Sequence, residues 1–120
     1  MSLHFSVRQS GDVAILDLRG KWTIDDGELL NRHLQKLAGG GVRKILLNLG
    51  DVRLIDSSGV SSMVRMRTSV RRQGGDVRLL RPSQHAMDVL RVLHLLDMIP
   101  TFEEESLAVA SFAGMATSKP

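Results

Sequence analysis

The spacing of apolar and polar residues predicts where the strands of this chain lie. Positions alternate over 5–8 and Val13–Arg19, and Gly11-Asp12 lies between the two segments, which indicates an antiparallel hairpin. Both sets of alternating positions in the second segment are partly apolar, so we expect that strand to be covered on both faces. The run Ile45-Leu46-Leu47 within 42–49 predicts a central strand that is buried on both faces.

Apolar residues at helical spacing predict four helices between and after these strands. The first expected helix covers residues 25–38, the second contains Val60 to Val70 and is closed by Gly74-Gly75, and the last two cover 83–94 and 103–113. Two short strands are expected at 77–80 and 99–102. The resulting order is ββαβαβαβα. Strands that alternate with helices require a largely parallel sheet. We therefore predict an α/β fold with an antiparallel edge hairpin and helices chiefly on one side.

Several inward-facing positions in these helices are also predicted. In the third helix Ala86, Met87, Leu90 and Leu93 are expected to face the sheet. In the second helix an apolar arc that contains Met63, Met66 and Val70 faces either the sheet or a partner. Arg67 falls inside this arc, and we interpret it as a long side chain whose aliphatic stem packs while its charge reaches solvent.

Composition limits the chain to one domain and excludes several kinds of site. At 120 residues we assign residues 1–114 to a single domain and 115–120 to a flexible C-terminal tail. The chain has no cysteine, which excludes thiol nucleophiles, disulfides and cysteine-ligated metals. The apolar stretches fall far short of the roughly 20 residues of a membrane-spanning helix. Without a signal-like N-terminus, the expected location is the cytoplasm, with no membrane association.

The net charge of +3 produces only a weak electrostatic attraction for nucleic acid. The basic residues of 65–81 spread around a helix and have no interleaved aromatic residues for base stacking. We interpret them as a solvated face and expect no direct contact with nucleic acid.

The segment Ile55-Asp56-Ser57-Ser58-Gly59-Val60 is the strongest candidate site, because it lies where a buried strand and its loop lead into a helix. One interpretation is structural: Asp56 or Ser57 caps the helix and Gly59 permits close backbone packing. The other is functional, since a hydroxyl at a helix N-terminus is exposed and tolerates a phosphate.

Other kinds of site find little support. The leading glycine of a Gly-x-Ser-x-Gly nucleophile motif is missing before Asp56-Ser57-Ser58-Gly59. The four histidines have neither i, i+4 spacing nor an accompanying carboxylate cluster for a metal. Gly39-Gly40-Gly41 follows a helix rather than a strand, which is the wrong order for a phosphate-binding loop. We therefore expect no catalytic residue, no metal and no cofactor.

The sequence resembles the STAS domain family, which includes bacterial anti-sigma factor antagonists and the cytoplasmic domains of sulfate transporters. The resemblance covers nearly the whole chain. It is carried by the segments VAILDLRG (13–20), KILLNL (44–49), VRLIDSSG (52–59) and GGDVRL (74–79).

This resemblance implies a partner-switching function in transcription regulation. Ser57 matches the serine that is phosphorylated in the antagonists. The partner would be both anti-sigma factor and serine kinase, with ATP and Mg²⁺ belonging to that kinase. The unphosphorylated antagonist binds this partner and frees the sigma factor, phosphorylation breaks the complex, and a phosphoserine phosphatase resets it. The resemblance implies that the protein itself is not an enzyme and that it is a monomer or a weak dimer.

Two departures from the family pattern affect the expected partner surface. Gly20-Lys21-Trp22-Thr23 stands where family members often have Gly-Glu-Leu-Asp, so two acidic residues are lost. Many members also continue as Gly-Leu-Gly where this chain has Gly59-Val60-Ser61-Ser62, so the start of the second helix is more polar here. Trp22 is either a lid over the end of the core or an anchor for a partner. The expected partner-binding residues are Asp56, Ser57, Ser58, Gly59, Trp22 and Ser61.

Two alternative functions stay open. In a constitutive scaffold or a transporter-associated STAS module, Ser57 would be only a helix cap. A nucleotide-binding module would use the same loop, helped by Arg53 or Lys21.

Overall fold

The fold is a five-stranded mixed sheet in which the strands lie side by side in chain order. The computed structural model describes residues 3–115, without the side chains of residues 24–27. The first strand is antiparallel to the second, and the remaining pairs are parallel. The strands are β1 (Leu3–Ser10), β2 (Val13–Trp22), β3 (Lys44–Ile55), β4 (Asp76–Leu80) and β5 (Thr101–Phe102). This arrangement confirms the predicted α/β class, the element order and the edge hairpin.

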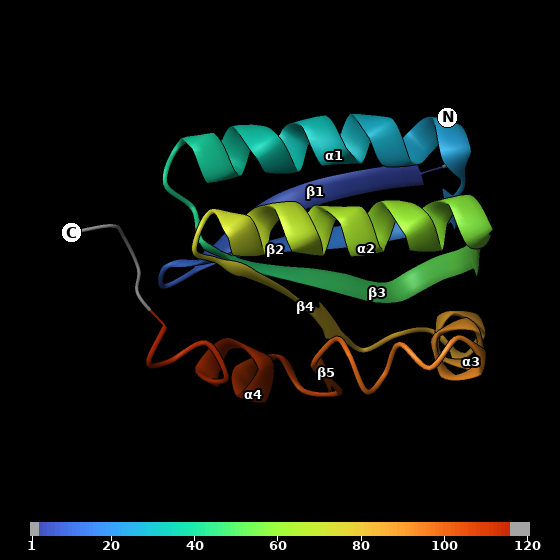
Figure 1. The fold of residues 1–120 in the computed structure, drawn as a ribbon. Coiled ribbons are helices and arrows are strands. Elements are labelled where there is room, and N and C mark those ends of the chain that lie inside the picture. The colour runs from blue at the N-terminus through green and yellow to red at the C-terminus, as the bar shows by residue number, and fades with distance from the viewer. Residues whose placement is uncertain (1–2, 116–120) are drawn as a thin grey trace.

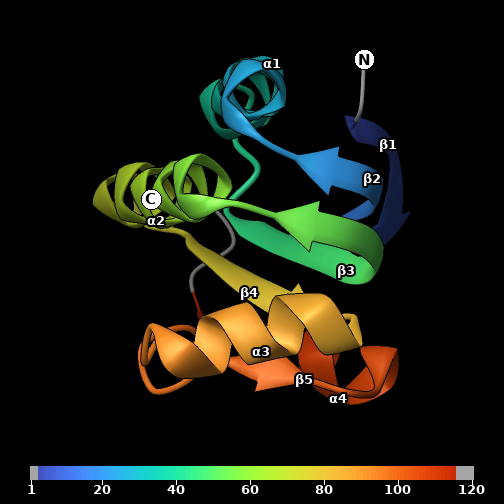
Figure 2. The same ribbon diagram turned by 90° about the vertical axis from the view of Figure 1, so that its right-hand side faces the viewer.

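Four helices connect or follow these strands, and three of them pack with one face of the sheet. They are α1 (Ile24–Gly39), α2 (Ser57–Arg72), α3 (Gln84–Val92) and α4 (Glu105–Ala110). Figure 1 shows α1 and α2 side by side above the sheet with α4 below it, and Figure 2 shows the same separation from the side. The prediction of helices chiefly on one side is therefore confirmed, with α4 as the exception.

Two separate hydrophobic cores explain why β2 is apolar on both faces. Ala14, Leu16 and Leu18 belong to the larger core under α1, α2 and α3. Val13 and Ile15 point the other way, as alternation along a strand requires, and join a smaller core with Ala108 and Phe112. The sequence prediction that this strand is covered on both faces is confirmed.

Some predicted boundaries were wrong. β3 continues through residues 50–55, where a loop was expected, because Val52 and Ile55 are buried and pair with the end of β2. α3 ends at Val92 rather than His94, and the left-handed backbone of His94 (φ 59°) turns the chain away. Leu93 is therefore 48% exposed and does not face the sheet.

Met115 is the first residue of the predicted C-terminal tail. Met115 packs against the smaller core, and its backbone N–H donates to the Phe112 carbonyl (3.1 Å). The rest of that predicted tail, residues 116–120, lies outside the described residues.

The buried ion pairs at Asp76 correct our interpretation of Arg67 and of the solvated basic face. Met63, Met66 and Val70 are fully buried, so this part of α2 faces the sheet. Arg67 is buried with them and donates from Nε to Asp76 Oδ1 (2.9 Å) and from Nη1 to the carbonyl of Met98 (2.9 Å).

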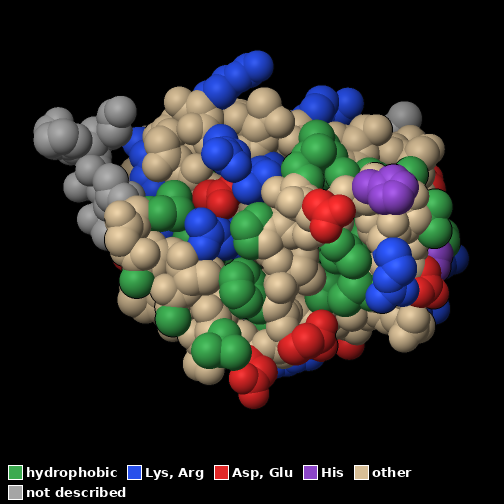
Figure 3. All heavy atoms as spheres, turned by 60° about the horizontal axis from the view of Figure 1, so that its bottom comes forward, with side chains coloured by type: hydrophobic (Ala, Val, Ile, Leu, Met, Phe, Trp, Pro, Cys, Tyr) green, Lys and Arg blue, Asp and Glu red, His purple; other side chains and the backbone are tan. Residues whose placement is uncertain are grey.

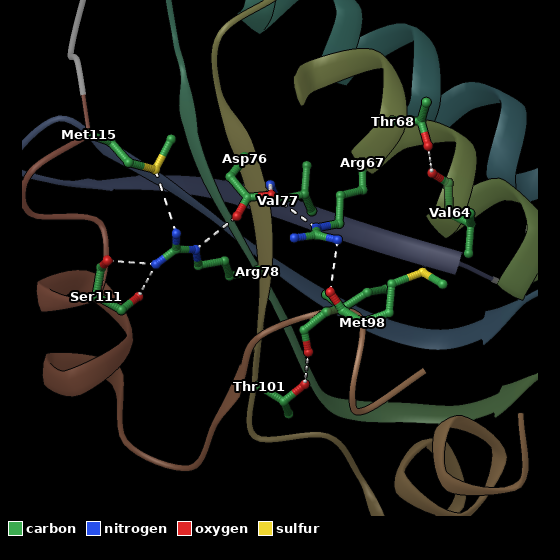
Figure 4. A network of polar contacts seen from close by, with 11 residues as sticks. Val64, Arg67, Thr68, Asp76, Val77, Arg78, Met98, Thr101, Ser111 and Met115 are labelled. Atoms are coloured by element: carbon green, nitrogen blue, oxygen red, sulfur yellow. Dashed lines mark hydrogen bonds and ion pairs between the residues drawn. The ribbon is translucent and has the colours of Figure 1, made fainter. Parts of the chain in front are cut away.

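Arg78 binds the other oxygen of the same carboxylate. Its Nε lies 3.0 Å from Asp76 Oδ2, its Nη1 reaches the carbonyl of Ser111 (2.6 Å), and its guanidinium stacks 4.5 Å from the centre of the Phe112 ring. Figure 4 shows how this network, the Asp76 network, joins α2, β4, the segment before β5 and the end of α4. It therefore connects elements on both faces of the sheet.

A second ion-pair cluster holds the start of α4 against the edge hairpin. Arg8 on β1 donates to Asp17 on β2 (2.6 Å) and, through two nitrogens, to Glu105 on α4 (2.6 and 2.8 Å). Asn48 also donates to Asp17 (2.8 Å). The hydrogen bonds from Arg8 lower the pKa of Asp17 and the pKa of Glu105 below their ordinary values.

This cluster predicts a loss of stability in acid. Because the folded-state pKa of both carboxyls is lowered, their contribution is present at neutral pH and is lost as the pH falls below about 4. Arg8→Gln removes the cation that favours both carboxylates. We expect its free energy of unfolding, measured by urea denaturation, to depend less on pH between neutral and acidic buffers than that of the parent. Parallel pH curves for the two proteins would contradict this assignment.

Candidate functional site

The candidate site begins where β3 ends and α2 begins. Asp56 is the N-cap of α2, and its Oδ1 accepts a hydrogen bond from the backbone N–H of Gly59 (2.9 Å). Ser57 is the first helical residue and is exposed. Its hydroxyl makes no hydrogen bond with any other residue that the structure describes. Of the two predicted capping residues, the cap is therefore Asp56, and the Ser57 hydroxyl stays accessible.

The start of α2 lies directly against the end of β2. The Asp56 N–H points to the Trp22 carbonyl oxygen at 3.4 Å. A Cβ atom added to Gly59 would lie 2.4 Å from the same oxygen and 2.8 Å from a side-chain carbon of Ile55. Only a residue without a side chain fits there, which fixes the position of Ser57 relative to the sheet.

A polar groove of about 540 Å³ runs from Ser57 between α1 and α2. Four serine hydroxyl groups from α2 line it together with side chains from both helices: Glu28, Asn31, Ser57, Ser58, Ser61, Ser62 and Arg65. Farther along the helices, Gln35 donates to Ser69 (3.0 Å) and Gln73 donates to Gln35 (3.2 Å), so that the two helices are joined there. The groove thus lies at the N-terminal end of α2, next to the candidate serine.

One acid and one base give this groove its charge. Glu28 comes from α1 and Arg65 from α2. Neither residue was expected at the site from the sequence. The positions of Ser58, Ser61, Ser62 and Arg65 on α2 do follow an i, i+3, i+4, i+7 pattern, which marks one helix face. Lys21 and Arg53, expected to help a nucleotide, do not line the groove.

The structure corrects the placement of Trp22. The sequence pattern predicted that β2 ends before Trp22, but this residue is the last of the strand, and its side chain is fully buried in the larger core. An anchor for a partner has to be exposed. The indole therefore closes the end of the core, as the first of the two interpretations held, and only the Trp22 carbonyl takes part in the site.

The described residues hold no group of three or more histidine or acidic side chains that could bind a metal ion. His85 Nε2 lies 3.5 Å from the carbonyl oxygen of Ile55, the last residue of β3. Among the described helices, none is long and apolar enough to cross a membrane.

Comparison with known proteins identifies what this arrangement resembles. The sequence model of the STAS domain matches residues 4–108. A Thermotoga neapolitana protein, provisionally named an anti-sigma factor antagonist, is 32% identical over 104 residues, which cover 86% of this chain and 92% of that protein.

Solved structures show the same fold. The crystal structure of a Thermotoga maritima protein with the same provisional name aligns with a TM-score of 0.78 at 26% identity, covering 89% of this chain and 92% of that one. SpoIIAA, an anti-sigma factor antagonist from Bacillus, is 19% identical. It aligns with TM-scores of 0.77 in its unphosphorylated form and 0.70 in its phosphorylated form, which cover 94% and 90% of this chain and 99% and 98% of those chains.

Proposed function

This chain belongs to the STAS domain family, and we propose that it is an anti-sigma factor antagonist whose partner binding is switched by phosphorylation of Ser57. In the unphosphorylated state it binds a kinase-type anti-sigma factor, and phosphorylation releases it. The observation that carries the proposal is the exposed Ser57 hydroxyl, free of hydrogen bonds to other described residues, at the first position of α2. The names of its relatives support an anti-sigma factor as the partner.

A phosphate at this position acts on the partner surface rather than on the fold. It adds nearly two negative charges at a helix N-terminus, where the helix dipole favours an anion. The modified hydroxyl makes no contact that the fold would lose, so the domain stays folded. The new charge lies in the same groove as Glu28. A partner surface that fits Ser57 and Glu28 would then meet two like charges, which lowers its affinity.

The neighbouring residues position Ser57 and complete the surface. Asp56 caps α2 and so fixes the orientation of its first turn, while Gly59 lets that turn approach β2. Ser58 and Ser61 continue the polar surface along the groove. The protein supplies no catalytic group to the phosphorylation: the kinase provides ATP and Mg²⁺, and a phosphoserine phosphatase reverses the reaction in the cytoplasm.

Labelling by the kinase tests the phosphoacceptor. We expect a kinase-type anti-sigma factor encoded next to this gene to transfer phosphate from ATP to Ser57 and to label Ser57→Ala at background level only. Phosphopeptide mass spectrometry measures the modified position. Ser106→Ala is the matched control, because Ser106 is an exposed serine on α4, away from the groove. Equal labelling of Ser57→Ala and the parent would show that another residue is the acceptor.

Binding of the same anti-sigma factor tests the switch. We expect Ser57→Asp to weaken binding about tenfold or more, because it places a permanent charge at the start of α2, and tenfold corresponds to about 1.4 kcal/mol. Isothermal titration calorimetry measures the affinity, and Ser106→Asp controls for the added charge. Unchanged binding by Ser57→Asp would favour the alternative of a constitutive scaffold or a transporter-associated module.

A further inference from the structure

The side of α1 that faces away from α2 forms a second groove, against β1. Its volume is about 480 Å³, and it is lined by Phe5, Leu29, Arg32, His33 and Lys36. The rings of Phe5 and His33 meet edge to face, with centroids 5.1 Å apart. Leu29 is 41% exposed, so an apolar surface lies between the cationic side chains. We call this surface the basic groove.

The charge of the basic groove is not neutralised within the part of the chain that the structure describes. Neither Arg32 nor Lys36 forms an ion pair with another described residue, and none of the carboxylates that the structure describes lines the groove. Lys36 lies in the last turn of α1, where the helix dipole also favours a cation. A partner for this groove therefore needs negative charge next to an exposed apolar side chain.

The same chain carries such a surface at α4. Glu103 and Glu104 are exposed and precede that helix, and Leu107 on its first turn is 57% exposed. Figure 3 shows acidic side chains beside exposed hydrophobic ones at the lower edge of the face that carries α3, β5 and α4. Arg8 pairs with the carboxylate of Glu105, and Arg81 donates to the backbone carbonyl of Glu103 rather than to its carboxylate. We call Glu103, Glu104 and Leu107 the acidic patch.

We propose that the acidic patch of one copy of this protein docks into the basic groove of a second copy. Two carboxylates then face two cations, and Leu107 covers Leu29 and the edge of Phe5. The two surfaces belong to helices on opposite faces of the sheet, as Figures 1 and 2 show. The contact is therefore head to tail. One copy of the pair keeps a free groove and the other keeps a free patch, so further copies add in a chain.

This association is independent of the proposed switch. The basic groove and the polar groove next to Ser57 share no lining residue, since α1 contributes Glu28 and Asn31 to the polar groove and other side chains to the basic groove. Exposed ion pairs contribute little free energy each, so the association is weak and strongly dependent on salt. A loss of self-association would leave phosphorylation of Ser57 intact, and a failure of the Ser57 proposal would leave self-association intact.

Sedimentation equilibrium of the full chain tests the proposal. At about 20 mM salt, where screening is weak, we expect the average mass to rise above the monomer mass of 13.2 kDa as the protein concentration increases. At about 500 mM salt the mass should return to that of the monomer. A monomer mass throughout the concentration series at low salt would overturn the proposal.

Two charge-reversed variants identify the surfaces. Arg32→Glu/Lys36→Glu makes the groove acidic, and Glu103→Lys/Glu104→Lys makes the patch basic. Each variant should be monomeric on its own, because its groove and its patch then carry charge of the same sign and repel each other. An equal mixture should associate again, because the groove of each variant now complements the patch of the other. A mixture that stays monomeric would overturn the proposal.

A matched control separates this contact from general charge effects. Arg71→Glu/Arg72→Glu changes the net charge by the same amount as the groove variant. Both residues lie in the last turn of α2, as Lys36 lies in the last turn of α1. This variant should associate like the parent. If this control loses association as fully as the groove variant, net charge rather than the basic groove drives the assembly, and the proposal is wrong. Circular dichroism confirms that each variant is folded.

Discussion

Asp76→Ala is expected to cost about 3–5 kcal/mol of folding free energy, because it leaves two guanidinium groups in the interior without their counter-ion. The Asp76 carboxylate accepts hydrogen bonds from Arg67 and Arg78 and also from the backbone N–H of Val77 (2.9 Å). The side chains of Asp76, Arg67 and Arg78 are only 8%, 11% and 16% exposed. Water cannot replace the lost carboxylate without a rearrangement of α2 and α4.

Urea denaturation followed by circular dichroism measures this loss. Asp88→Ala is the matched control, since Asp88 also pairs with an arginine, Arg91, but both side chains are more than half exposed. That control should change the free energy of unfolding by less than about 0.5 kcal/mol, as surface ion pairs do. Similar losses in the two variants would mean that Asp76 is not the centre of a buried network.

The element order was predictable because buried positions recur along the sequence with the period of a strand or a helix. The continuous apolar run at 45–47 and the two-sided apolar character of β2 correspond to a sheet that is covered on both faces. The end of β3 was not predictable in this way. Its residues 50–54 include polar and exposed side chains, and only pairing with the end of β2 keeps them in the strand.

The buried ion pairs of the Asp76 network were not predictable from the sequence, for a different reason. Arg67 falls within an apolar arc, and a long cationic side chain in such a place usually reaches solvent. Whether it does depends on what covers it. Here the segment that contains Met98 lies over α2, and Asp76 at the start of β4 supplies the counter-ion. Both contacts depend on tertiary packing, which local periodicity does not encode.

The candidate site also combines features that local sequence predicts with features that depend on tertiary packing. The Asp-Ser-Ser-Gly segment predicted the cap and the exposed hydroxyl, because capping depends on residues three positions apart. Glu28 lies on a different helix, α1. It joins the site because α1 packs beside α2, and this neighbour relation is tertiary. The burial of Trp22 likewise follows from where β2 ends under the helices.

Gly59→Ala is expected to destabilise the protein by about 1–3 kcal/mol, the usual range for overpacking, and to displace Ser57 as well. The added methyl group would lie 2.4 Å from the Trp22 carbonyl oxygen and 2.8 Å from Ile55. The first of these neighbours is a backbone atom at the end of β2, which cannot rotate away as a side chain could. The first turn of α2 must therefore lift from the end of β2, which lengthens the contact between Asp56 and Trp22.

A glycine in another helix separates this steric effect from the general effect of alanine. Gly39 is the last residue of α1, and a Cβ there meets nothing within 4 Å. Gly39→Ala should leave the free energy of unfolding unchanged or raise it by up to about 1 kcal/mol, since alanine restricts the unfolded chain. Gly59→Ala should lose stability and also be a poorer substrate for the Ser57 kinase at a temperature where it is fully folded. Normal stability of Gly59→Ala would mean that α2 does not begin against the Trp22 carbonyl, and the geometry that exposes Ser57 would have to be revised.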